Sequence, residues 1–137
     1  DDIIDAFGEI RNPEILDDII NNILWNKIRE QDVWYQMKTL SLNRCATKKL
    51  WDTVTSKWND VLEMFIPGSS ALTYIVKVIA CGFMTQQELN EYKTFFLTKP
   101  AGTDMSIRQT IESTSSKILS IDRIVHDREF REFLENV

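Results

Sequence analysis

Apolar residues recur every three or four positions along almost the whole chain, and this spacing constrains the fold more than any other feature. It gathers apolar side chains on one face of an α-helix, which has 3.6 residues per turn. The 137 residues include only 4 glycines and 3 prolines, too few for the many tight turns of a β-sandwich or barrel. The sequence therefore predicts an all-α fold of roughly six to eight helices joined by short loops.

Local signals mark where several of these helices begin. Asn12 before Pro13 predicts one start, because Asn caps free backbone N–H groups and proline has no N–H to satisfy. Thr47 is expected to cap a later helix in the same way. Thr85 and Glu88 have the spacing of a capping box, in which each side chain accepts from the other residue's backbone N–H.

Glycine and proline residues mark where helices end. Pro67-Gly68 is expected to end one helix over residues 47–65, and Ser69 or Ser70 to cap the helix that follows. Gly82 is expected to end that second helix by adopting the left-handed conformation, which glycine reaches without a steric penalty.

The apolar stripes also predict which side chains face the core. Residues 3–10 are expected to be the end of a first helix, and a long helix is expected from about Asp104, followed by a last segment at 128–137. The predicted inward-facing side chains are Phe7, Ile10, Ile15, Leu16, Ile19, Ile20, Ile23, Leu24, Val33, Trp34, Met37, Leu40, Leu50, Trp51, Val54, Trp58, Val61, Leu62, Phe65, Leu72, Ile75, Val76, Ile79, Leu89, Tyr92, Phe95, Phe96, Ile107, Ile111, Thr114, Ile118, Ile121, Val125, Phe130, Phe133 and Leu134.

Charge and hydropathy exclude two kinds of partner. With 16 Lys+Arg against 21 Asp+Glu the net charge is −5, which argues against nucleic acid, because phosphate binding needs a basic face. No apolar run approaches the roughly 18 residues that a membrane span requires, so no membrane partner is expected. The chain opens at Asp1 without the basic segment of a signal peptide. We expect residues 1–137 to be a single helical domain, cut from a longer protein.

Spacing reveals no catalytic apparatus in this sequence. Cys45 and Cys81 stand in no C-x-x-C pattern; one disulfide is possible, but two buried free thiols in an intracellular protein are favoured. His126, the single histidine, lies in a charged run and is interpreted as a solvated helix residue rather than a base. The glycines form no phosphate-binding loop. We therefore expect no catalytic, cofactor-binding or metal-ligating residue in this chain.

Two further groups of residues each allow a functional and a structural interpretation. Trp51 and Trp58 share one helix face and are able to form a stacking platform, but packing in the core is favoured. Lys48-Lys49 and the pair Arg128 and Arg131 are able to grip a peptide carboxylate. Screened surface charge is the favoured interpretation of these basic residues.

Short segments along the chain, taken in order, resemble one known family. The segments are Ile28-Arg29-Glu30-Gln31-Asp32, Leu50-Trp51-Asp52, Lys57-Trp58-Asn59-Asp60-Val61, Tyr92-Lys93-Thr94-Phe95-Phe96 and Ile107-Arg108-Gln109-Thr110-Ile111. In this order and spacing they look like the C-terminal helical domain of the gluzincin zinc aminopeptidases, which include puromycin-sensitive, endoplasmic-reticulum and yeast arginine/alanine aminopeptidases. The resemblance covers essentially the whole chain and is nearest to fungal cytosolic members.

The resemblance implies a fold and a role. Family members have paired antiparallel helices in a curved HEAT/armadillo-like array, and this chain would be the C-terminal part of that larger α-solenoid. The domain would enclose the active-site chamber and contact the distal part of peptide substrates, in a cytoplasmic parent that removes N-terminal amino acids. The implied partners are the parent's catalytic domain and peptides. Zinc would belong to that catalytic domain, because its His-Glu-x-x-His motif is absent here.

Two other interpretations stay open. The parent has lost its peptidase chemistry and still holds peptides or proteins, in which case this chain belongs to a binding scaffold. Alternatively, the chain is an unrelated helical-repeat adaptor. An intact or degenerate catalytic motif upstream distinguishes the first of these from an active enzyme.

Overall fold

The structure is a computed structural model that describes residues 7–98 and 100–136. Within these ranges the regular secondary structure is helical throughout and includes no strand, which confirms the predicted all-α class. In chain order the elements are α2 (Pro13–Asp18), the π-helical segment η1 (Ile19–Ile23), α3 (Leu24–Asn26), α4 (Glu30–Leu42), α5 (Thr47–Ser56), α6 (Trp58–Met64), α7 (Ser70–Val78), α8 (Gln86–Phe95) and α9 (Asp104–Glu135).

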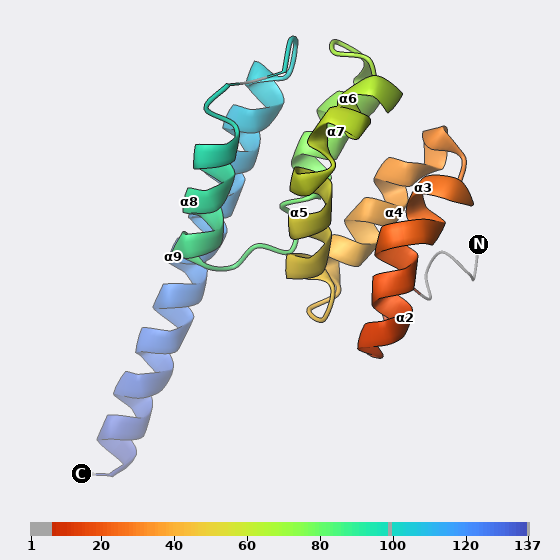
Figure 1. Cartoon of the computed structure of the whole chain (residues 1–137). Coiled ribbons are helices and arrows are strands. Elements are labelled where there is room, and N and C mark those ends of the chain that lie inside the picture. Colours follow the sequence, from red (N-terminus) through yellow and green to blue (C-terminus); the bar gives the residue numbers. More distant parts are fainter. Residues whose placement is uncertain (1–6, 99, 137) are drawn as a thin grey trace.

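Each helix packs mainly against its neighbours in a row (Figure 1). The continuous run α2–η1–α3 contacts α4 and α5, α4 packs against both α5 and α7, and α7 packs against α9, which also pairs with α8. The row therefore leads from the N-terminal helices through α4 and α7 to the pair α8–α9. The curvature expected of a HEAT/armadillo-like array stays a prediction.

Three of the predicted helix starts are confirmed. The Asn12 side chain accepts from the backbone N–H of Glu14, and Pro13 occupies the first helical position. Ser69 caps α7 by accepting from the N–H of Leu72. The capping box of α8 is also present. The Thr85 hydroxyl accepts from the backbone N–H of Glu88, and the Glu88 carboxylate accepts from the backbone N–H of Thr85.

The apolar stripes predict the core correctly in α4, α5 and α7. The buried side chains from α2 to α9 include Leu16, Ile19, Ile20, Leu24, Val33, Met37, Leu40, Leu50, Trp51, Val54, Val61, Phe65, Leu72, Ile75, Val76, Ile79, Leu89, Tyr92, Phe96, Ile107, Thr114 and Ile118. Ile15 differs from the prediction and is exposed at the surface of α2. It lies at the edge of a wide stripe, so its neighbours on the helix face reach the core and it does not.

A buried polar junction joins α4, α5 and the turn after α7. The Ser41 hydroxyl donates to the carbonyl oxygen of Ile79 at 3.2 Å and accepts from the N–H of Gly82 at 3.0 Å. The Thr47 hydroxyl lies 2.6 Å from the carbonyl oxygen of Ser41, to which it donates. Because Ser41 and Thr47 are buried, these bonds satisfy polar groups that water cannot reach.

Two predictions about this junction were wrong. Thr47 is not the N-cap of α5: it is the first residue of the helix, and its hydroxyl is taken by Ser41 and Asn43. Gly82 does not adopt a left-handed conformation, since the positive φ angles among the described glycines belong to Gly68 and Gly102. Glycine is needed at position 82 for space, because a Cβ there would lie 1.8 Å from the Ser41 carbonyl oxygen.

The helix expected over residues 47–65 is divided in two. Lys57 interrupts it between α5 and α6 with φ −101° and ψ 21°. Just before the interruption, the hydroxyls of Thr55 and Ser56 donate back to carbonyl oxygens of the preceding turn, at 2.8 Å in each case. Such bonds compete with the backbone ladder and bend helices.

The two ends of the chain also depart from the predictions. Residues 7–9 form a turn instead of a helix, since the carbonyl oxygens of Phe7 and Ile10 accept from the Asn43 side chain; residues 1–6 lie outside the described ranges. The segment expected at 128–137 is part of α9, which continues to Glu135 beyond every other helix (Figure 1). The predicted core residues Val125, Phe130, Phe133 and Leu134 are therefore exposed.

Trp51 and Trp58 lie in an aromatic cluster with side chains of α8. The Trp51 ring is buried, and the centroids of both indole rings lie within 5.6 Å of the Phe95 ring in edge-to-face arrangements. Trp58 makes a second edge-to-face contact with Phe96 at 5.3 Å. The aromatic faces are occupied by one another, which supports the core-packing interpretation over a stacking platform.

Gly82→Ala is expected to lower the free energy of unfolding by about 3 kcal/mol, because the new Cβ would overlap a backbone oxygen that belongs to α4. Gly68→Ala is the control, because no atom lies within 4 Å of a Cβ added there. Its φ of 92° is unfavourable for alanine, so the substitution is expected to lower the free energy of unfolding by about 1–2 kcal/mol through the backbone conformation alone. Urea unfolding measures both. Equal losses would contradict the close approach at Gly82.

Trp51→Ala is expected to destabilise the fold by about 3–5 kcal/mol, because it removes a large buried side chain. Trp58→Ala should cost clearly less, since that ring is only half-buried. The measurement is chemical denaturation followed by circular dichroism. A larger loss at Trp58 than at Trp51 would contradict this description of the cluster.

Candidate functional site

The structure does not bring the predicted reactive residues together. Cys45 and Cys81 are free thiols, as predicted, but Cys45 is exposed and Cys81 is only half-buried, so the predicted burial of both thiols is wrong. His126 lies exposed on α9, where its Nδ1 is 3.9 Å from a Glu129 carboxylate oxygen. In residues 7–98 and 100–136, no three His, Cys, Asp or Glu side chains are placed to share a metal ion.

The basic pairs that were considered for carboxylate binding lie at the surface. Lys48 forms an ion pair with Asp52 at 3.4 Å, and Lys49 pairs with Asp17 at 2.8 Å. Arg128 and Arg131 lie on the exposed end of α9, which no other helix reaches. The ion pairs of the lysines and the exposure of the arginines support the interpretation of both pairs as surface charge.

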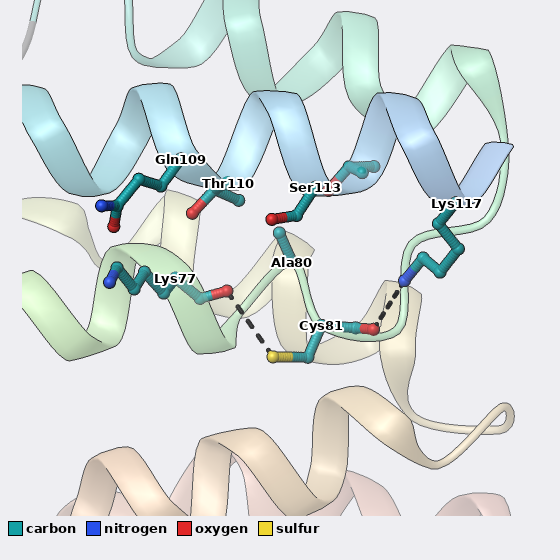
Figure 2. Close-up of a pocket in the computed structure, with 8 residues that line it drawn as sticks. Lys77, Ala80, Cys81, Gln109, Thr110, Ser113 and Lys117 are labelled. Atoms are coloured by element: carbon teal, nitrogen blue, oxygen red, sulfur yellow. Dashed lines mark hydrogen bonds between the residues drawn. The ribbon is translucent and has the colours of Figure 1, made fainter. Parts of the chain in front are cut away.

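One candidate site is a cavity of about 470 Å³ between α7 and α9 (Figure 2). Helix α9 contributes a row of polar side chains at the spacing of one helix face, and α7 and its C-terminal turn form the facing wall. The lining residues are Lys77, Ala80, Cys81, Gln109, Thr110, Ser113, Thr114 and Lys117. None of them is acidic.

Lysines give this cavity a positive charge. Lys77 is the one charged residue of α7, and Lys117 projects from α9, where its Nζ donates to the carbonyl oxygen of Cys81 at 2.9 Å (Figure 2). Lys38 of α4 lies near enough to act electrostatically on the Cys81 thiol. Among the residues the structure describes, no carboxylate forms an ion pair with any of these three lysines.

The cavity disfavours thiolate chemistry. Burial raises the pKa of the Cys81 thiol, and this outweighs the opposite effect of Lys38 and Lys117. The thiol also donates to the carbonyl oxygen of Lys77, at a sulfur–oxygen distance of 3.8 Å. A neutral, hydrogen-bonded thiol is a poor nucleophile. The arrangement is therefore suited to binding an anionic group rather than to covalent chemistry.

Lys77 and Lys117 were not predicted as site residues from the sequence. Two signals were present in the sequence: Lys77 interrupts an otherwise uncharged helix, and α9 carries a run of hydroxyl residues where an apolar stripe is usual. That these two features face each other depends on the packing of α7 against α9, which no local pattern encodes.

The fold and cavity together define an all-α domain whose distinctive feature is a lysine-lined cavity between two packed helices. Residues 1–116 match the family described as the ERAP1-like C-terminal domain. The match spans most of the chain, and the chain belongs to this family. The predicted resemblance is thereby confirmed.

Several relatives are aminopeptidases by name. The chain is 26% identical to aminopeptidase 2, mitochondrial, of Saccharomyces cerevisiae over 86% of its length and 12% of that protein's. It is 28% identical to aminopeptidase 2 of Candida albicans, over 86% of this chain and 13% of the relative. With endoplasmic reticulum aminopeptidase 2 of Bos taurus, 31% identity covers 66% of this chain and 10% of the relative. The chain thus spans only a small part of the relatives it matches.

Hydropathy adds one finding about the helices. Within the described ranges, none combines the length and the apolar character needed to cross a membrane.

Iodoacetamide is expected to alkylate Cys45 severalfold faster than Cys81 near neutral pH, because Cys45 is exposed and burial raises the pKa of Cys81. Peptide mapping by mass spectrometry after timed quenching gives both rates. The same reaction in urea is the control and should make the two rates similar. Faster modification of Cys81 in the folded chain would show that its thiol is activated.

Proposed function

We propose that this chain is the C-terminal helical domain of a zinc aminopeptidase, where it encloses the active-site chamber and contacts the distal part of peptide substrates. The observation that carries the proposal is the match of residues 1–116 to the ERAP1-like C-terminal domain. The chain would then be the C-terminal end of a longer protein, whose catalytic domain is its first partner and which removes N-terminal amino acids from peptides.

The packing of the helices supports this role. The helix groups follow one another in a row, with additional aromatic contacts between α5 and α8. Stacked helices offer extended surfaces for binding, which supports a role in bordering a chamber and meeting a peptide. The cavity between α7 and α9 adds a place where part of a peptide is able to enter the surface.

The zinc of the proposed enzyme is assigned to its catalytic domain. The described part of this chain does not fit such an ion, because it presents no converging set of ligands. The contribution of this chain would be to exclude bulk water and to hold the peptide, while bond cleavage takes place elsewhere. The cytoplasmic location expected from the sequence stays a prediction, and the name of the Saccharomyces relative includes the word mitochondrial.

The upstream sequence of the parent tests the proposal first. We expect an intact His-Glu-x-x-His motif with a downstream Glu, and a full-length protein that releases N-terminal amino acids from peptides. Chelation of zinc should abolish that release, and added zinc should restore it. The 137-residue chain alone is the control and should release nothing.

Two outcomes would contradict the proposal in different ways. Broken zinc ligands in a recognisable catalytic domain, with peptide binding but no release, would identify a peptide-holding scaffold. A parent with no peptidase domain would remove the aminopeptidase role altogether and leave a helical adaptor.

A further inference from the structure

The cavity between α7 and α9 carries positive charge at both of its ends, in a chain whose net charge is −5. Lys77 and Gln109 lie toward one end, and Lys117 lies at the other (Figure 2). We propose that this cavity binds a small linear dicarboxylate, with one carboxylate at the Lys77 end and the second at the Lys117 end. The ligand is a free small molecule and no part of a peptide substrate, so the inference does not depend on the proposed function.

The charge of the two lysines is available to a ligand. Among the residues the structure describes, no carboxylate forms an ion pair with Lys77 or Lys117. By contrast, Lys48 and Lys49 on α5 are both paired with aspartates. Low-dielectric walls concentrate the field of charges that line a hollow, so an anion is attracted here more strongly than to a flat surface. Each end of the cavity therefore offers one positive charge to an anionic group.

The separation of the two ends selects an extended ligand. Gln109 and Lys117 are about two turns apart on α9, which is roughly 12 Å along the helix axis. A polar contact of about 3 Å at each end leaves roughly 6 Å for the ligand itself. A single carboxylate is too short to meet both ends. A chain of about five carbons spans this distance, because each C–C bond is about 1.5 Å long.

The walls between the two ends suit the middle and the oxygens of such a ligand. Gln109, Ser113 and Lys117 share one face of α9, and the first two are exposed (Figure 2). Their amide and hydroxyl groups can donate to carboxylate oxygens. Ala80 and the uncharged thiol of Cys81 line the cavity on the side of α7, where they provide an apolar surface for methylene groups.

Lys117 is already held in position for its role. Its Nζ donates to the Cys81 carbonyl oxygen at 2.9 Å (Figure 2). This contact uses one of the three N–H groups of the side chain and leaves two for a ligand. Less side-chain freedom is lost on binding when the donor is already fixed.

One positive charge at each end suits carboxylate better than phosphate. A carboxylate carries a single negative charge near neutral pH, whereas a phosphate ester carries about 1.5 to 2. The lining residues also include no arginine, whose planar fork suits phosphate. The charge of the cavity is therefore matched by a diacid.

The test is an NMR titration of the chain at low ionic strength with succinate, glutarate, adipate and pimelate, with butyrate as the monocarboxylate control. The backbone amide signals of Gln109 and Lys117 report the two ends of the cavity. We expect glutarate or adipate to bind most tightly, at least about fivefold more tightly than butyrate, and added salt to weaken the binding. Both amides should give the same dissociation constant, because one molecule spans the cavity.

Three variants locate the binding. Lys77→Met should weaken the affinity for glutarate by about three- to tenfold, the range for a partly exposed charge contact, and the Lys117 amide should report the same loss. Lys117→Met should weaken it similarly, but it also removes the bond to Cys81, so Lys77→Met is the decisive variant. Lys93→Met, an exposed position on α8, makes the same change in net charge outside the cavity and should have no effect.

Several results would overturn the inference. Glutarate that binds no more tightly than butyrate, or an affinity that does not change with chain length, would show that the two ends do not hold one molecule. Different dissociation constants at Gln109 and Lys117 would indicate two separate anion sites. Inorganic phosphate that binds more tightly than every diacid would reassign the ligand. Each of these results leaves the proposed function untouched, because the upstream zinc motif and peptide hydrolysis are measured independently of this cavity.

Discussion

The buried polar junction at Ser41 is the constraint on which the arrangement of the helices depends. The Ser41 hydroxyl donates to the carbonyl oxygen of Ile79 and accepts from the N–H of Gly82, so it spans the turn after α7. The backbone carbonyl oxygen of Ser41 accepts from the hydroxyl of Thr47 at the start of α5. Each bond replaces one to water, so a shift of any of the three segments would leave a buried polar group unpaired. The junction thus holds α7 in place, and α7 in turn forms one wall of the cavity.

Features that depend on residues close together in the chain could be predicted from the sequence. Asn12 and the pair Thr85–Glu88 act within one helical turn, and the stripes of α4, α5 and α7 follow the helical period. Features that depend on how one element meets another could not. Thr47 has the chemistry of a cap, but Ser41 and Asn43 take its hydroxyl. Gly82 needs space because another helix lies there, which a single sequence does not encode.

The candidate site and the end of α9 illustrate the same limit. Lys77 and Lys117 are far apart in sequence and line one cavity because α7 packs against α9. Phe130, Phe133 and Leu134 are apolar, and amphipathic spacing alone predicts that they are buried. Burial also needs a partner, and α9 extends beyond the other helices before it reaches them. Periodicity predicts the face of a helix but not whether another element covers it.

The electrostatics of the cavity separate binding from catalysis. The Lys117 side chain is tied to the turn after α7, because its Nζ donates to the Cys81 carbonyl oxygen at 2.9 Å. Burial raises the pKa of the Cys81 thiol and favours its uncharged form. The cavity therefore offers fixed cations beside an unreactive thiol. This combination supplies positive charge without a reactive nucleophile, which suits the cavity to binding rather than to covalent chemistry.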